Sequence, residues 1–220
     1  MPAHTVGVWG NGSLKTSAGR LGYDVFTGNA PTIQMSDPSV AGTGTLDPGL
    51  GGAGARGATF GANLNFSFGG SADGLHVGVH ALTSKVGDTA IVMNSTRLKM
   101  FGGWLAYLDD GWEIMAEQYS FRNSDIGSGL RHSSSAAYAQ LGRQFGAWTP
   151  YGRYEVTSLD QTDAYFAQQE SGQSYKRFVA GLRYDISPRT ALKLEANHTR
   201  HTDREIDSHS ELRGQFAIRF

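Results

Sequence analysis

The chain has 220 residues, a formal net charge of -1 and no cysteine, and these values exclude several classes of protein. The near-neutral charge argues against a nucleic-acid-binding or polybasic membrane-surface role. The lack of cysteine excludes disulfides, thiolate metal sites and cysteine nucleophiles. No run reaches the ~18 apolar residues of a transmembrane helix. The 30 glycines are about twice the average share and favour strands and loops.

Segments that alternate apolar and polar residues recur along the whole chain, whereas long stretches with helical periodicity are missing. In the clearest segment, Phe60, Leu64 and Phe66 share one face, and Asn63 and Asn65 share the other. The pattern predicts eleven antiparallel strands. In chain order they cover about 4–11, 18–28, 57–68, 74–84, 97–108, 112–121, 134–145, 151–157, 175–185, 190–199 and 210–220.

The connections between these strands alternate between short and long. The short ones are 69–73, 109–111, 146–150 and 186–189, with a looser one at 12–17, and the long ones are about 29–56, 85–96, 122–133, 158–174 and 200–209. Outer-membrane barrels have short periplasmic turns and long extracellular loops. The chain is therefore predicted to be all-β, a single antiparallel transmembrane β-barrel domain over 1–220. A soluble sandwich with the same apolar residues turned inward is the alternative.

The chain ends on an alternating strand that places Phe216, Ile218 and Phe220 on one face. A terminal aromatic residue of this kind looks like the sorting signal of bacterial outer-membrane barrels. We therefore predict that these three residues form the membrane-assembly signal, with the barrel-assembly machinery as a partner. This signal places the C-terminus in the periplasm. Because bacterial single-chain barrels have an even number of strands, we expect further strands and a signal peptide upstream of Met1, unless one strand is missed inside 29–56.

A lipid-facing belt needs outward apolar residues flanked by aromatic girdles. The outward candidates are Leu64, Phe66, Tyr154, Val156, Leu182, Tyr184, Leu192, Leu194, Phe216 and Ile218. The girdle is predicted to contain Trp112, Trp148, Tyr151, Tyr184 and Phe220, which lie near turns.

Charged residues at every second position of the opposite faces are predicted to line a water-filled lumen. A Lys or Arg facing the middle of the hydrocarbon would cost about 2–4 kcal/mol. The predicted pore-lining residues are Glu113, Glu117, Arg153, Glu155, Arg177, Arg183, Asp185, Lys193, Glu195, Arg213 and Arg219. Two interpretations remain open. The charges either form a weakly selective, anion-leaning pore wall or form cross-strand ion pairs that stiffen the interior.

Several strings resemble those of Gram-negative porins, especially the group similar to phosphate-selective porins O and P. They are Pro150-Tyr-Gly-Arg-Tyr-Glu155, Ala180-Gly-Leu-Arg-Tyr-Asp-Ile-Ser-Pro188, Ala191-Leu-Lys-Leu-Glu195 and Gln215-Phe-Ala-Ile-Arg-Phe220. The resemblance implies a monomeric or homotrimeric aqueous channel for small hydrophilic solutes in the bacterial outer membrane, in contact with lipid and lipopolysaccharide. The chain is shorter than full porins of this group. Phosphate specificity does not follow from the residues.

The remaining motifs do not predict an enzyme, and an omptin-type protease or an outer-membrane phospholipase is the catalytic alternative. The Gly-rich segment 41–57 lacks the Gly-Lys-Ser/Thr of a Walker loop, and it either constricts the lumen or forms a surface loop. His198 and His201 lack a third metal ligand, and His132 beside Ser133 indicates a polar loop. We expect a passive channel with no catalytic residue, metal or cofactor, and no nucleic-acid partner. The alternative is a structural or surface-interaction barrel, or a truncated remnant, without pore activity.

Overall fold

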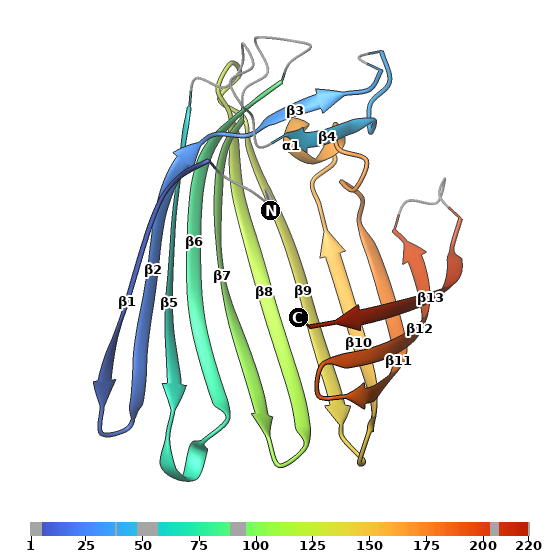
Figure 1. Cartoon of the computed structure of the whole chain (residues 1–220). Helices are drawn as coiled ribbons and strands as arrows, with labels where there is room; N and C mark the ends of the chain where they lie inside the picture. Colours follow the sequence, from blue (N-terminus) through green and yellow to red (C-terminus); the bar gives the residue numbers. More distant parts are fainter. Residues whose placement is uncertain (1–5, 38, 48–56, 89–95, 203–206, 220) are drawn as a thin grey trace.

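The structure, a computed structural model, describes residues 6–37, 39–47, 57–88, 96–202 and 207–219. Within these ranges the chain forms an all-β antiparallel fold of the outer-membrane β-barrel type (Figure 1). The main sheet follows the order β1-β2-β5-β6-β7-β8-β9-β10-β11-β12-β13, while β3 and β4 lie off this path. The strands are β1 (Gly7–Thr16), β2 (Gly19–Asn29), β3 (Thr32–Met35), β4 (Gly44–Asp47), β5 (Ala58–Phe68), β6 (Leu75–Asp88), β7 (Thr96–Asp109), β8 (Trp112–Asp125), β9 (Arg131–Arg143), β10 (Trp148–Ser158), β11 (Tyr175–Ser187), β12 (Thr190–His201) and β13 (His209–Ile218).

The helical content of the described residues is small. It consists of a 3₁₀ turn (Gly70–Ala72) and α1 (Ala164–Ala167). None of the helices in these ranges has the length and apolarity to cross a membrane. Regular structure in this chain therefore comes almost entirely from strand pairing.

The main sheet has one apolar face that nothing in the described ranges covers. Phe60, Leu64, Val79 and Phe101 lie on this face of β5, β6 and β7, and between 48% and 59% of each is exposed. A soluble sandwich would bury such residues against a second sheet. The sandwich alternative is therefore wrong for this part of the chain.

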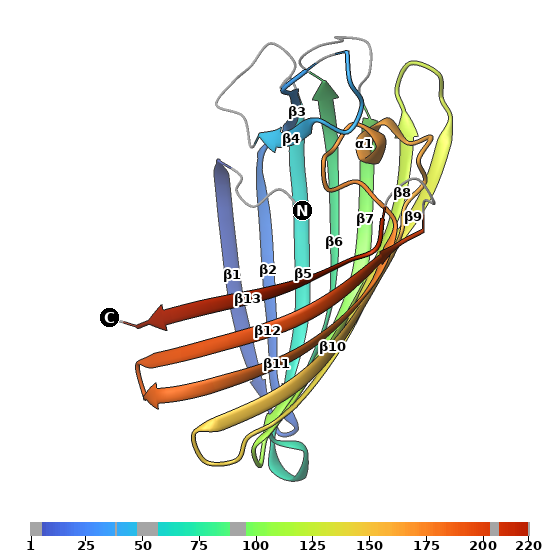
Figure 2. The ribbon, with the colours of Figure 1, turned by 90° about the vertical axis from the view of Figure 1, so that its right-hand side faces the viewer.

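The sheet is strongly curved, and its polar face is the concave one. Figure 2 shows β10 to β13 running across the direction of β1 to β9. Arg183 Nη1 on β11 lies 3.0 Å from Glu113 Oε1 on β8, three strands away along the sheet. Both side chains must therefore project into the hollow of the sheet. In the described residues, β1 pairs only with β2 and β13 only with β12, so the wall is open between these two edges.

All eleven predicted strands are confirmed, but the first hairpin differs from the prediction. β1 covers Gly7–Thr16 instead of 4–11, and a tight turn at 17–18 replaces the loose connection at 12–17. Gly12 resembled a turn residue, but it lies in the strand opposite Tyr23. A Cβ at Gly12 would lie 2.5 Å from the Tyr23 hydroxyl, so this glycine makes room for an aromatic side chain.

The long connections also differ in detail. Because β8 extends to Asp125 and β9 begins at Arg131, the predicted loop at 122–133 shrinks to 126–130. The connection at 69–74 is longer than this, so the strict alternation of lengths is not complete. Within the other long connections, β3, β4 and α1 were not predicted. Four-residue elements carry too little periodicity to be recognised.

The buried apolar core lies on the concave face at the end of the long connections, and we call it the cap cluster. Its members are Ile33, Leu82, Val86, Leu98, Met100, Tyr165 and Phe166. β3 pairs in parallel with β6, and β4 connects to the α1 region through Gly44 N–H, which donates to the carbonyl of Gln168 at 2.8 Å. Figure 1 shows β3, β4 and α1 together at this end of the sheet.

The cap cluster bears on the predicted role of the Gly-rich segment. Within the described part of 29–56, Ile33 packs in the cap cluster at the inner wall, and Met35 and Leu46 pack against that cluster. This placement agrees with the constriction hypothesis. Residues 48–56 of that segment lie outside the described residues.

Candidate functional site

A chain of ion pairs crosses the concave faces of β10, β11 and β12, and Glu155 is its first centre. One carboxylate oxygen of Glu155 accepts a hydrogen bond from Arg153 Nε at 2.7 Å, and the other lies 3.4 Å from Arg177 Nη1. Glu155 and Arg177 are direct partners in the β10–β11 register. The Arg177 guanidinium also lies 4.6 Å from the Tyr175 ring centre. The two cations thus compensate the half-buried carboxylate.

Glu195 on β12 is the second centre. Its carboxylate accepts a hydrogen bond from the Tyr151 hydroxyl at 2.6 Å and lies 3.1 Å from Lys193 Nζ and 3.6 Å from Arg153 Nη2. A Cβ at Gly181 would lie 2.0 Å from the Tyr151 ring, so the absent side chain leaves room for this contact. The prediction that Tyr151 belongs to the outward girdle is therefore wrong. Its register position turns it inward, opposite to Trp148 and Tyr184, whose rings lie 4.3 Å apart.

Arg183 forms the third centre, nearer the short turns. Its guanidinium lies 3.0 Å from Glu113 on β8 and 3.1 Å from Asp185 on its own strand. Each of the three side chains is 24–35% exposed. The two carboxylates share this one cation, and all three groups remain in reach of water.

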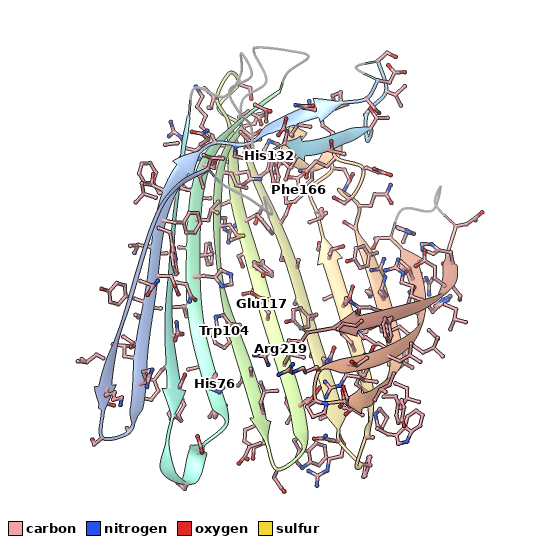
Figure 3. The ribbon with its side chains drawn as sticks, viewed as in Figure 1. His76, Trp104, Glu117, His132, Phe166 and Arg219 are labelled. Atoms are coloured by element: carbon pink, nitrogen blue, oxygen red, sulfur yellow. The ribbon has the colours of Figure 1, made fainter. Side chains whose placement is uncertain are left out.

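A second polar region follows the concave faces of β5 to β8. Trp104 Nε1 donates to Asn63 Oδ1 at 3.4 Å, and Asn63 Nδ2 donates to Asp24 at 3.1 Å. Glu117 lies 3.9 Å from His80 Nδ1. Figure 3 shows Trp104 and Glu117 on the same side of the sheet as His76.

The predicted pore-lining residues occupy two environments. Arg213 is 58% exposed and pairs with Glu211 on β13. Arg219 follows the end of β13 and is exposed (Figure 3). The half-buried residues on the concave faces are Glu113, Glu117, Arg153, Glu155, Arg177, Arg183, Asp185, Lys193 and Glu195.

The predicted assembly signal is only partly described. Phe216 and Ile218 lie on the convex face and are 59% and 52% exposed, whereas Phe220 lies outside the described residues. Three inward partners of the charged residues were not predicted from the sequence: Tyr151, His80 and Glu211. The alternation of side chains between the two faces of each strand could have identified them.

At the end of the long connections, His132 holds the segment 159–174. Its two ring nitrogens lie 3.2 Å from an Asp160 oxygen and 3.4 Å from an Asp125 oxygen. Hydrogen bonds from the Thr162 hydroxyl and backbone N–H lower the pKa of Asp160. Burial raises the pKa of Asp163, which accepts a hydrogen bond from Asn123 Nδ2 at 2.7 Å.

The Thr162 hydroxyl lies 3.3 Å from His132 Nδ1, but it donates a hydrogen bond to Asp160 Oδ1 at 2.6 Å. The Ser133 hydroxyl accepts a hydrogen bond from Arg122 at 2.7 Å, on the face opposite to His132. His198 contacts Ser210, whereas His201 stacks on His209, so the two histidines point to different faces. Across the described ranges, no group of three or more His, Cys, Asp or Glu side chains could hold a metal ion.

The comparisons with known proteins give likenesses to solved structures only. No protein-family model and no curated protein matches the sequence. The solved structure of LpxR from Salmonella typhimurium matches with 14% sequence identity and a TM-score of 0.35, covering 97% of this chain and 88% of that one. LpxR is an outer-membrane enzyme with a barrel fold.

This likeness corrects the prediction that the chain is not an enzyme. That prediction treated a barrel without a recognisable motif as a passive channel, and the matching structure is an enzyme. The exclusion of enzymatic activity is therefore wrong. At this level of similarity, the likeness assigns no catalytic residue or reaction to the present chain.

Proposed function

We propose that this chain forms the wall of an outer-membrane channel through which small hydrophilic or ionic solutes diffuse passively. The observation that carries the proposal is the separation of the two faces. The convex face presents exposed Leu64, Val79 and Phe101, whereas the concave face holds the centres at Glu155, Glu195 and Arg183. Apolar residues facing outward and charges facing a hollow suit a wall between lipid and water.

The proposed channel is weakly selective. The centres and Glu117 together contain four cations and five carboxylates, so their fields largely cancel. Fixed charges select ions through the field of rings of one sign. The pairing favours the interpretation in which the ion pairs also stiffen the wall. The resemblance to phosphate-selective porins remains a prediction.

A closed wall requires partners for the outer edges of β1 and β13. Unpaired backbone N–H and C=O groups are costly in hydrocarbon, which is why spanning sheets close on themselves. Localisation in the bacterial outer membrane and a homotrimeric assembly belong to the same proposal.

Planar-bilayer recording of the purified full chain tests the function. We expect discrete conductance steps and a small reversal potential in a salt gradient. Glu155→Gln and Arg177→Gln should move this potential in opposite directions, because they remove opposite charges from one ion pair. A protein that folds in detergent but gives no conductance steps would instead support the structural or surface-interaction barrel.

A further inference from the structure

We propose that the convex face carries a binding site for a phosphorylated membrane lipid at the end of the long connections. The site would hold the lipid phosphate with four cations on β7, β8 and β9, and one acyl chain in an apolar groove beside them. The inference rests on the membrane placement in the proposed function, but it does not require conduction.

The cationic part of the site is a groove of about 590 Å³, which we call the basic groove. Arg97 and Lys99 lie on β7, Arg122 on β8 and Arg131 at the start of β9, and all four are exposed. Leu98 and Met100 alternate with the β7 cations and are 1% and 4% exposed, in the cap cluster. The cations therefore face away from the lumen.

The basic groove lacks the charge compensation found at the three centres of the concave face. On the concave face, Arg153, Arg177 and Arg183 all have carboxylate partners. The ion pairs of the described residues include none of the four groove cations. Arg122 donates instead to the Ser133 hydroxyl, which holds the guanidinium in the groove. Four cations without anions next to an apolar belt are complementary to a lipid phosphate.

The apolar part of the site adjoins the cations directly. A second groove of about 400 Å³ contains Lys99 together with Phe60, Ala62, Ala81 and Phe101. Lys99 thus lines both grooves. Ala62, Ala81 and Phe101 form one row across β5, β6 and β7, and Phe60 lies in the next row, so the two small side chains leave a shallow track beside the rings. An acyl chain in this track would bury apolar surface while its phosphate lies among the cations.

The balanced net charge of the chain hides this arrangement. Positive and negative residues nearly cancel in number, and from the sequence a polybasic membrane surface was therefore not expected. In the structure, strand carboxylates such as Glu117 and Glu155 lie on the concave face, whereas Arg97, Arg122 and Arg131 lie on the convex face. Opposite charges are therefore separated by the thickness of the sheet.

Native mass spectrometry of the full chain in a nonionic detergent tests the proposal. The probes are phosphatidic acid and phosphatidylcholine with the same acyl chains. We expect phosphatidic acid to bind more tightly, with an affinity that falls as salt rises. The Arg97→Gln/Arg122→Gln/Arg131→Gln variant should weaken it about 100-fold, since each surface cation contributes about fivefold.

A matched control separates a defined site from diffuse attraction. Lys176 and Arg200 are exposed partners on the convex faces of β11 and β12, outside the groove. Lys176→Gln/Arg200→Gln should change phosphatidic acid binding less than about twofold, because those cations would add only a distant field. An equal loss in the two variants would overturn the proposal, as would equal binding of both lipids to the unaltered protein.

Two further measurements distinguish lost binding from misfolding and a lipid ligand from free phosphate. Arg122→Lys retains the charge and should retain binding even if the triple variant folds poorly. Excess inorganic phosphate should compete only weakly, because it lacks the acyl chain; full competition would show that free phosphate is the ligand and would overturn the lipid site.

Failed conduction with intact lipid binding would contradict the proposed channel alone. A protein that remains soluble without detergent would contradict both proposals.

Discussion

Arg183 lies between Glu113 and Asp185, and this position gives its positive charge two simultaneous partners. Removal of the cation leaves two half-buried carboxylates without compensation. An uncompensated buried charge costs more than the original ion pair contributed. Because these groups remain partly exposed, water reduces the penalty. The ion pairs of the concave face thus respond differently to the loss of a positive charge and to the loss of a negative charge.

We predict that Arg183→Gln shifts the reversal potential toward cation selectivity and lowers the free energy of unfolding by about 1–2 kcal/mol. Bilayer recording and urea titration measure the two effects. Arg143→Gln is the control, because Arg143 pairs with Asp110 at a short turn and stacks on Trp112. An equal change of selectivity in both variants would argue against a lumen position for Arg183.

The pKa shifts of Asp160 and Asp163 predict that pH changes the stability of the segment 159–174 in opposite directions. The folded pKa of Asp160 is lowered by Thr162, so its stabilising contribution is present above the ordinary pKa and is lost below about pH 4. Burial raises the pKa of Asp163 in the folded protein. The stabilising contribution of Asp163 is therefore present below its ordinary pKa and is lost as pH rises through its folded pKa.

Hydrogen exchange of 159–174, corrected for intrinsic rates, measures these contributions. We expect Asp160→Asn to increase exchange at pH 7, since it removes a charge that the folded state favours. Asp163→Asn should leave exchange unchanged or lower it, because the amide avoids the cost of a buried charge. If both substitutions increased exchange equally at pH 7, the two carboxylates would not have the opposite roles assigned to them.

At the scale of elements, the cap cluster joins segments that are distant in the sequence. Phe166 of α1 packs edge-on against Phe121 of β8, with ring centres 5.2 Å apart. Ile33 of β3 packs in the same cluster and is 3% exposed. A hairpin and a single helical turn thereby cover the inner wall at one end of the lumen.

We predict that Phe166→Ala loosens the cap and raises single-channel conductance. A buried Phe→Ala change costs about 3–5 kcal/mol in a well-packed core, so we expect faster exchange in β3 and 159–174. Phe178→Ala is the control, because Phe178 lies on the convex face and is 58% exposed. Deletion of 36–54 should also raise conductance. Unchanged conductance despite a loosened cap would show that the cap does not narrow the path.

At the scale of the whole molecule, the curved sheet separates the lipid expected at its convex face from the water expected at its concave face. Leu64 and Asn65 are neighbours on β5 but lie on opposite faces, and they are paired with Val79 and Gly78 on β6. The same substitution at these two positions therefore compares a side chain that faces the proposed lipid with one that faces the proposed lumen.

We predict that Leu64→Arg prevents stable insertion into bilayers, whereas Asn65→Arg does not. Arginine facing the bilayer midplane costs about 2–4 kcal/mol, and arginine facing a water-filled lumen avoids this cost. Folding into lipid vesicles, followed by gel mobility without heating, compares the variants. Similar insertion of both would mean that the convex face does not contact hydrocarbon.

The sequence alone determined the strands of the main sheet and the faces of most of their residues. Alternation has a period of two residues, so it can be read within each segment, as at Phe60, Leu64 and Phe66. The eleven strands followed from this local signal, and nine of the predicted pore-lining residues lie half-buried on the concave faces. The position of Gly12 was misjudged because its neighbour across the sheet, Tyr23, is not adjacent in sequence.

Only the tertiary structure decided which residues meet. Arg183 reaches Glu113 across 70 residues of sequence because the sheet curves, and curvature leaves no periodic mark in the chain. The same curvature places β3 and α1 over one end of the hollow and keeps Arg97, Arg122 and Arg131 away from the carboxylates. Local alternation set the two faces, whereas long-range packing decided which charges are paired and which remain available to a ligand.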